Sequence, residues 1–458
     1  MTFEKFFSPS SVAIIGASHT KGKIGYAIAE NFVRESFKGR VYAVNPDTTP
    51  ILGLPTYKSV LNIPDKIDLG IIVVPAVFVA KVLKECVKKK IPLVIIISGG
   101  FSEIGEKGKK LEEGLKKVLK KSKTRVIGPN CVGVYDSATK VDTLFLPIDR
   151  LKRPKQGNIA FVSQSGAVGS TILDWLAVEG VGISKFVSYG NAIDVNEAQL
   201  VNFLAHDENT KVIAVYLEGI KSDGKQFMKI AKQVSKKKPI VVLKAGKTAK
   251  GEQAVASHTG SLAGSERIFA AVFKQTGLVE AQNWEELVDF AKAFSMQPLP
   301  KGGKLAIVTD GGGFGVLAAD ETERMNLELP EPSASMVKNL KNKLPTYVSL
   351  HNPFDITGDA TTERYQLVLE EILKKEFDGV IVIALMQVPT LDNKIINTIV
   401  SMKKFGKPIL CCMIGSEFTE RVEKMLENNE IPVYQTPERA VRAFASLNYY
   451  AKKKKEIM

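Results

Sequence analysis

Histidine, cysteine and long apolar segments are scarce in this chain of 458 residues. The four cysteines, Cys86, Cys131, Cys411 and Cys412, show neither metal-ligand spacing nor the dense pattern of a secreted disulfide scaffold, so we expect reduced thiols and no metal site. No apolar run is long enough to span a bilayer, and the N-terminus lacks the charged start and apolar core of a signal peptide. These absences predict a cytoplasmic protein with no membrane partner.

Nucleic-acid motifs are also missing. The net charge of +14, from 63 basic and 49 acidic residues, comes largely from scattered lysines. Aromatic side chains do not alternate with these lysines, so the charge favours small polyanionic ligands or an acidic partner over DNA or RNA. The sequence contains neither a Walker A motif nor a GxGxxG motif.

The first part of the chain alternates apolar strand patterns with helix patterns, which is typical of a doubly wound parallel sheet. We expect a helix over 24–34 and strands over 11–18, 40–46, 68–76 and 92–100. The first strand leads into a glycine-rich turn, residues 16–25, whose backbone N–H groups suit a phosphate.

Residues that follow the other strands help to define the expected ligand. An NAD site needs an acidic residue after the second strand, and this chain has Asn45 there, which favours another phosphate-bearing nucleotide. Small or polar residues, including Pro75, Ser98, Gly99 and Asn130, follow the later strands. Exposed backbone at several neighbouring strand ends predicts a long crevice.

The middle part restarts the same pattern. A strand over 158–166 leads through Ser163, Ser165 and Gly166 into a helix, whose N-terminus is either a plain cap or an anion site. A second strand ends near Glu218, and a third, over 239–246, leads into a small-residue stretch over 251–266 that contains His258. We expect that stretch to be a long, pliable loop.

The third part begins near residue 303 and predicts another parallel sheet. A strand over 305–310 is followed by Gly311, Gly312, Gly313 and Gly315 at the start of a helix, which suggests close approach of a ligand to the backbone. We expect local structural roles for His351 and Asp355.

Five motifs in this order, GASHTKGKIG, GPNCVG, FVSQSG, LEG and ASHTGSLAG, resemble the α subunit of ADP-forming acyl-CoA (acetyl-CoA) synthetases, relatives of succinyl-CoA synthetase. The resemblance implies the reaction acyl-CoA + ADP + phosphate ⇌ acid + CoA + ATP, through an acyl phosphate and a phosphohistidine. It implies an α/β fold: a Rossmann-like CoA-binding domain (1–150), a flavodoxin-like domain with the phosphohistidine loop (151–300) and a second flavodoxin-like, CoA-ligase-type domain (301–458).

The resemblance also implies site residues. His258 would be the phosphorylated nucleophile, and Glu218 would orient or stabilise it. The residues implied along CoA are Gly16, Ser18, Lys21, Asn45, Pro75, Ser98, Gly99 and Asn130. Those implied around phosphate are Ser163, Ser165, Gly166, Gly313 and Gly315.

Parallel α/β patterns account for the whole length, which leaves no segment for an ATP-grasp module. ADP or ATP, with Mg²⁺, is therefore expected on a second polypeptide, an ATP-grasp β subunit, in an α2β2 heterotetramer. A non-catalytic CoA or acyl-CoA binding or sensing protein is the alternative. The His258 and Glu218 pair favours the enzyme, because a sensor has no need of it.

Overall fold

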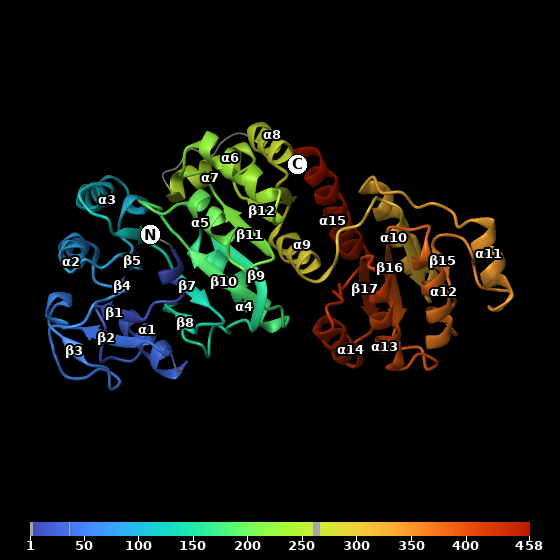
Figure 1. The fold of residues 1–458 in the computed structure, drawn as a ribbon, viewed down its shortest axis with the longest axis horizontal. Coiled ribbons are helices and arrows are strands. Elements are labelled where there is room, and N and C mark those ends of the chain that lie inside the picture. Colours follow the sequence, from blue (N-terminus) through green and yellow to red (C-terminus); the bar gives the residue numbers. More distant parts are fainter. Residues whose placement is uncertain (1–2, 36, 260–265) are drawn as a thin grey trace. The chain divides into compact units, whose positions relative to one another are not determined.

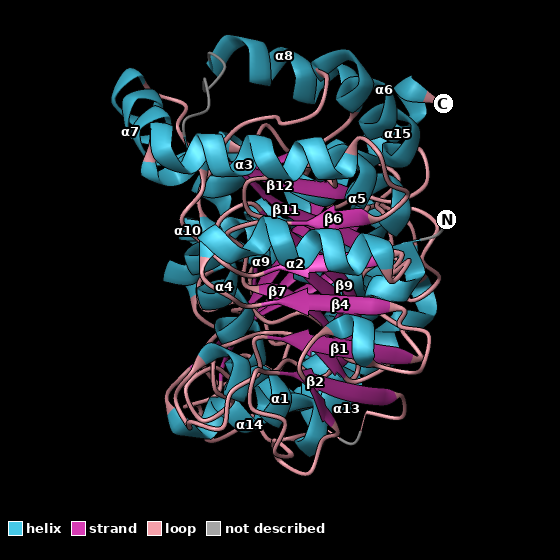
Figure 2. Cartoon of the chain, turned by 90° about the vertical axis from the view of Figure 1, so that its left-hand side faces the viewer, coloured by secondary structure: helices cyan, strands magenta, loops and turns pink. Residues whose placement is uncertain are grey.

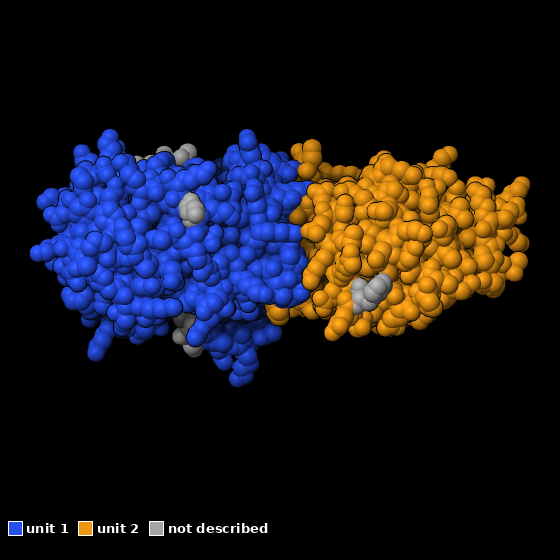
Figure 3. All heavy atoms as spheres, turned by 90° about the horizontal axis from the view of Figure 1, so that it is seen from below, with its two compact units in different colours: residues 1–280 blue, residues 281–458 orange. Residues whose placement is uncertain are grey.

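The residues that the structure describes form three sheets, mostly of parallel strands, in two compact units, Met1–Glu280 and Ala281–Met458 (Figures 1 and 3). This computed structural model describes residues 3–35, 37–259 and 266–458, with only the backbone for residues 256–259 and 418. None of the described helices combines the length and the apolar character needed to cross a bilayer.

The first sheet is entirely parallel, with strand order β3-β2-β1-β4-β5-β6. This 3-2-1-4-5-6 order is that of the Rossmann fold, whose ligands bind beyond the carboxyl ends of the strands. The strands are β1 (Ser11–Ile15), β2 (Arg40–Val44), β3 (Thr56–Tyr57), β4 (Leu69–Ile72), β5 (Leu93–Ile96) and β6 (Arg125–Ile127).

Helices cover both faces of this sheet because its strands are apolar on both sides. Helices α2 (Ala76–Lys88) and α3 (Glu106–Leu119) lie side by side on one face, and α1 (Ile24–Arg34) lies on the other (Figure 2). The short helices are η1 (Phe3–Phe6), η2 (Val60–Asn62) and η3 (Ser102–Ile104).

The second sheet has the order β13-β12-β11-β9-β10-β7-β8. Its parallel strands follow the flavodoxin order, and β7 pairs antiparallel with β10 at one side. The strands are β7 (Gly133–Asp136), β8 (Val141–Asp142), β9 (Gln156–Ser163), β10 (Ile183–Ser188), β11 (Val212–Leu217), β12 (Ile240–Lys244) and β13 (Val279–Ala281). The helices are α4 (Gly166–Val178), α5 (Glu197–Leu204), α6 (Gly224–Ser235), α7 (Ala249–Thr259) and α8 (Glu266–Thr276).

The two sheets of unit 1 are joined at β6 and at the segment after β10. The backbone N–H groups of Asn191, Ile193 and Val195 donate to carbonyls of Pro129, Gly128 and Val126 at 3.0–3.1 Å. Gly190 permits this approach, because a Cβ there would lie 2.2 Å from the Pro129 carbonyl oxygen. One apolar core runs through both sheets, which explains why they form a single unit.

Unit 2 contains a parallel sheet of order β15-β14-β16-β17, with helices on both faces. Its strands are β14 (Leu305–Thr309), β15 (Phe354–Asp355), β16 (Gly379–Leu385) and β17 (Ile409–Ile414). Its helices are α9 (Trp284–Met296), α10 (Gly312–Arg324), α11 (Ala334–Lys341), α12 (Thr362–Lys374), α13 (Lys394–Ser401), η4 (Met402–Phe405), α14 (Glu417–Asn428) and α15 (Pro437–Ile457).

Each of the three sheets corresponds to one part of the predicted α/β series. The predicted boundaries near 150 and 300 do not coincide with changes of sheet or unit. Strands β7 and β8 belong to the second sheet, because β7 completes the pairing of β10, and α9 belongs to unit 2, because it packs on α15. The division into three domains stays a prediction.

The glycine-rich turn after β1 depends on contact between two glycines. A Cβ on Gly25, in the first turn of α1, would lie 2.0 Å from the carbonyl oxygen of Gly16. We predict that Gly25→Ala lowers the free energy of unfolding by about 1–3 kcal/mol, because the helix must move away from the strand end. Chemical denaturation measures this change.

The matched control is Gly114→Ala in α3, where an added Cβ meets nothing within 4 Å. It should be neutral or stabilise the protein by up to about 1 kcal/mol, because alanine is the better helix former. Equal effects of the two substitutions would contradict the close packing of Gly25.

Candidate active site

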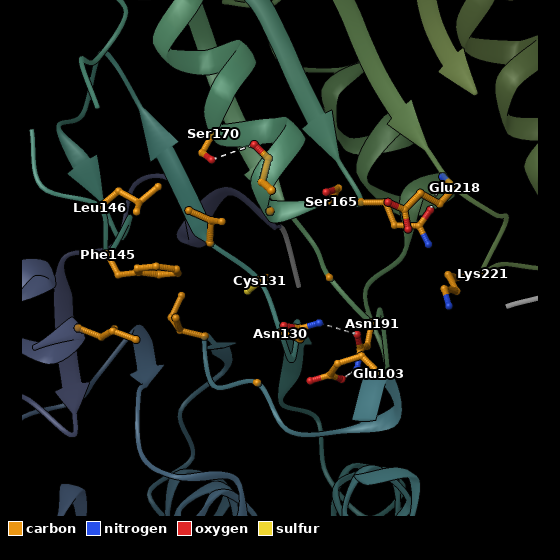
Figure 4. Close-up of a pocket in the computed structure, with 18 residues that line it drawn as sticks. Glu103, Asn130, Cys131, Phe145, Leu146, Ser165, Ser170, Asn191, Glu218 and Lys221 are labelled. Carbon is orange, nitrogen blue, oxygen red and sulfur yellow. Dashed lines mark hydrogen bonds between the residues drawn. The ribbon is translucent and has the colours of Figure 1, made fainter. Parts of the chain in front are cut away.

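A cavity of about 570 Å³ lies where the carboxyl ends of the two sheets of unit 1 meet (Figure 4). Phe145 and Leu146 lie toward one end, and Glu218 and Lys221 toward the other. The remaining lining residues are Ile24, Ile97, Gly99, Glu103, Asn130, Cys131, Val132, Gln164, Ser165, Gly166, Ala167, Ser170, Gly190 and Asn191. The cavity therefore has an apolar end and a polar, charged end.

The N-terminus of α4 forms one wall. Ser165 caps the helix by accepting a hydrogen bond from the Val168 N–H at 3.4 Å, and Ser163 Oγ donates to the Ser165 carbonyl at 2.7 Å. The first-turn N–H groups of Gly166 and Ala167 have no acceptor within the helix, and both residues line the cavity. This wall is suited to an anion.

Gln164 connects β9 to β11. Its Oε1 accepts hydrogen bonds from the backbone N–H groups of Glu218 at 2.8 Å and Gly219 at 3.1 Å. The Glu218 carboxylate is buried and accepts a hydrogen bond from the Tyr216 hydroxyl at 3.4 Å. The two bonds to Gln164 thus fix the backbone that carries Glu218.

Asn191 organises two carboxylates at the rim. Its Nδ2 donates to Glu103 Oε2 at 2.8 Å and to Glu112 Oε2 at 3.1 Å. Burial would raise the pKa of both carboxyls, but hydrogen bonds from Asn191, Ser102, Lys116 and neighbouring backbone groups hold both pKa values below the ordinary range. Both groups are therefore ionised at neutral pH.

Two further lining groups have altered acidity. Burial lowers the pKa of the Lys221 ammonium, against the opposing effect of the carboxylates of Glu112, Glu197 and Glu218. Burial raises the pKa of the Cys131 thiol to about 12, so it is a poor nucleophile. The described residues contain no cluster of three or more His, Cys, Asp or Glu side chains that could hold a metal ion.

The residues predicted along CoA follow strands of the first sheet at its carboxyl edge: Gly16 after β1, Asn45 after β2, Pro75 after β4, Ser98 and Gly99 after β5, and Asn130 after β6. Several also hold the edge together. Asn45 Nδ2 donates to the Ala17 carbonyl at 2.7 Å, Ser98 Oγ donates to the Val74 carbonyl at 2.6 Å, and Ser18 Oγ accepts the Thr20 N–H at 3.1 Å.

The cavity includes only some of these residues. Gly99 and Asn130 line it, whereas Lys21 lines a neighbouring cavity of about 770 Å³. Ile24, Phe145, Leu146 and Ser170 line both cavities. The two cavities therefore lie next to each other along the joined edge.

The prediction of a long loop around His258 is wrong. Residues Ala249–Thr259 form helix α7, and Gly251 lies inside it, where a Cβ would meet the Gly246 Cα at 2.9 Å. The residues 260–265 and the side chain of His258 lie outside the described part of the chain. Helix α7 contacts η3, whose Glu103 lines the cavity, so the helix that carries His258 lies beside this site.

The predicted phosphate residues Gly313 and Gly315 lie in the first turn of α10 in unit 2. A Cβ on Gly315 would lie 3.0 Å from Thr309 Cγ2, whereas one on Gly313 would meet nothing within 4 Å. In the same unit, His351 Nδ1 lies 3.0 Å from Glu331 Oε2, and Asp355 accepts the Thr357 N–H at 2.9 Å. The Asp355 contact is local in sequence, whereas His351 and Glu331 are 20 residues apart.

Sequence reasoning missed several cavity residues. The sequence patterns predict no role for Asn191, Glu103, Lys221, Phe145 or Leu146, and they include Gln164 in a motif without giving it a role of its own. The Gly190-Asn191 pair after an apolar run was the available signal for Asn191, since it indicates a turn at a strand end.

Comparisons with known proteins agree with this arrangement. Residues 10–137 match the CoA binding domain family, and residues 156–294 match the succinyl-CoA ligase like flavodoxin domain family. The α subunit of ADP-forming acetate–CoA ligase I from Pyrococcus furiosus is 41% identical over 99% of this chain and 98% of that protein. The ADP-forming acetate–CoA ligase of Methanocaldococcus jannaschii is 42% identical over 97% of this chain and 62% of that protein.

A solved structure shows the same fold. The dinucleotide forming acetyl-coenzyme A synthetase 1 of Ca. Korarchaeum cryptofilum, in complex with phosphate and ADP, has a TM-score of 0.93 and 37% identity, over 99% of this chain and 98% of that chain. A CoA-binding domain followed by a succinyl-CoA ligase-like flavodoxin domain defines the class of protein. Within this class, the chain belongs to the ADP-forming acetate–CoA ligase family, which confirms the predicted resemblance and fold class.

The hydrogen bonds from Asn191 to Glu103 and Glu112 should make a contribution to stability that depends on pH. Asn191→Ala should lower the free energy of unfolding by about 1–3 kcal/mol at neutral pH, because two ionised carboxylates lose a donor. The lowered pKa values of Glu103 and Glu112 make this stabilisation complete above their ordinary value of 4.5, and it is lost as the pH falls through the folded-state values. Denaturant titrations of both proteins from pH 7 to pH 3 should therefore converge at acid pH. A difference that does not depend on pH would contradict this role.

Proposed function

We propose that this protein is the α subunit of an ADP-forming acyl-CoA synthetase of the acetate–CoA ligase type. The reaction is acyl-CoA + ADP + phosphate ⇌ acid + CoA + ATP. The observation that carries the proposal is the cavity at the joined sheet edges, which brings a helix N-terminus and Glu218 together beside the helix that bears His258. The family supports an enzyme over a non-catalytic CoA sensor, because the relatives described above are named as ligases.

CoA would lie along the carboxyl edge of the first sheet. Gly16 leaves no side chain over the end of β1, where a Cβ would lie 3.0 Å from the Val73 backbone. Lys21 lines the cavity next to the main one and can neutralise a phosphate of CoA. The thiol end would enter the main cavity past Gly99 and Asn130.

Two steps would take place in the main cavity. Phosphate, held by the N–H groups at the start of α4, attacks the acyl carbonyl; a C–O bond forms, the C–S bond breaks, and CoA leaves as the thiolate. The His258 imidazole then attacks phosphorus, and the acid leaves as a carboxylate when its bond to phosphorus breaks. Glu218 would orient the imidazole and stabilise its positive charge.

The third step transfers the phosphoryl group from His258 to ADP. We place ADP and Mg²⁺ on a partner, an ATP-grasp β subunit, in an α2β2 assembly. The Pyrococcus furiosus relative is named as a subunit α, which supports a partner chain. Gly313 and Gly315 would contact the phosphoryl group from α10.

The test of the nucleophile is covalent labelling. With ATP, Mg²⁺ and the β subunit, the protein should acquire a phosphate that is labile in acid and stable in base, and His258→Asn should abolish both this label and net turnover. The matched control is His206→Asn, because His206 is exposed just after α5, where its Nδ1 lies 2.9 Å from the Asn202 carbonyl oxygen. A label that survives His258→Asn would exclude His258 as the carrier.

The test of Glu218 separates turnover from folding. Glu218→Gln should lower turnover about 10²-fold, because a neutral amide cannot stabilise an imidazolium. The midpoint of thermal unfolding and CoA binding by calorimetry should change little. Glu280→Gln serves as a control, since Glu280 pairs with Lys247 and does not line the cavity. Unchanged turnover in Glu218→Gln would return this residue to a structural role.

A further inference from the structure

Gln164 has a fixed amide orientation. It is 5% exposed, and its Oε1 accepts the N–H groups of both Glu218 and Gly219. Rotating the amide by 180° would place its NH₂ group against these two backbone donors. The nitrogen therefore occupies the other side of the amide, where it presents two N–H donors.

Those donors lack an acceptor within the described residues. Gln164 Nε2 is buried and has no hydrogen-bond partner there, although Gln164 lines the cavity. A buried donor without an acceptor costs about 1–3 kcal/mol, and native proteins seldom leave one unpaired. An oxygen atom of a bound molecule would satisfy it.

We propose that Gln164 Nε2 binds the carbonyl oxygen of the acyl group, an inference that rests on the proposed function. The cavity already has an anion site at the start of α4, made of backbone N–H groups that suit a charged phosphate. A neutral amide donor one residue before that helix cap suits the single oxygen of a carbonyl. In the first step, phosphate and the acyl carbonyl oxygen thus bind to different hydrogen-bond donors.

The hydrogen bond from Gln164 Nε2 to the carbonyl oxygen becomes stronger as the reaction proceeds. As phosphate attacks, the C–O bond forms and the π electrons of the carbonyl move onto its oxygen, which becomes an oxyanion. When this intermediate collapses, the C=O bond returns, the C–S bond breaks and the thiolate leaves. Gln164 keeps its protons throughout and gains hydrogen-bond strength only while the charge is present.

The attachment of Gln164 to β11 supports this role. The same side chain that carries the unpartnered Nε2 holds the backbone of Glu218 through Oε1. Any shift of the Gln164 side chain would therefore also move the backbone of Glu218. The position of the Gln164 donor is thus fixed by its attachment to the end of β11.

The test compares Gln164→Glu with Gln164→Met in the complete complex. Glutamate keeps an oxygen that accepts the two backbone N–H groups but has no donor when ionised, whereas methionine loses both functions. At pH 8, Gln164→Glu should form phosphohistidine from acetyl-CoA and phosphate about 10²-fold more slowly at saturating phosphate. Phosphohistidine formation from ATP should keep its wild-type rate, because no carbonyl takes part.

Protonation provides a rescue. As the pH falls, the carboxyl group introduced by Gln164→Glu takes up a proton and regains an O–H donor. The rate of this variant relative to wild type should therefore rise, whereas that of Gln164→Met should stay low. A higher KM for phosphate with an unchanged maximal rate would overturn the proposal in favour of phosphate binding. Equal losses in both assays would overturn it in favour of a structural role. Failure of the wild-type protein to form phosphohistidine would instead reject the proposed function.

Discussion

The close approach of the segment after β10 to the end of β6 creates the site. Three backbone hydrogen bonds connect residues 191–195 with residues 126–129, and they need a residue without a Cβ at Gly190. Carboxyl ends of parallel strands carry ligand sites in both fold types, and this contact makes the two edges continuous. The result is a cavity that neither sheet could enclose by itself. Its lining includes residues that follow β5, β6, β9, β10 and β11.

The charged side chains of this cavity include both carboxylates and an ammonium group. Ionised Glu103 and Glu112 hold the rim through Asn191, and Lys221 lies among carboxylates while burial lowers the pKa of its ammonium. Under the proposed function, phosphate binding would consequently be left to the backbone N–H groups at the start of α4. Fixed dipoles of this kind attract a phosphate without placing an acidic proton beside it.

The sequence predicts the fold class and the carboxyl-edge placement of Gly16, Asn45 and Ser98, because apolar strands followed by small residues are local signals. It does not predict β10, which contains the buried Lys185. This lysine is tolerated because Asp136 and Asp207 lie 3.2 Å and 3.0 Å from its ammonium, and both come from distant parts of the chain. Helix α7 was also missed, since glycine and serine favour loops over helices when tertiary contacts are unknown.

A transferred phosphoryl group must leave its site as readily as it enters. Interactions that bind ground state and transition state equally well would retain it and add nothing to the rate. A cavity with several arginines would retain the phosphoryl group in this way, whereas the start of α4 supplies only partial charges. Gln164 supplies a donor whose hydrogen bond strengthens as charge develops. Under the proposed function, neutral donors around Ser165 and Gly166 would let His258 receive the phosphoryl group and pass it on.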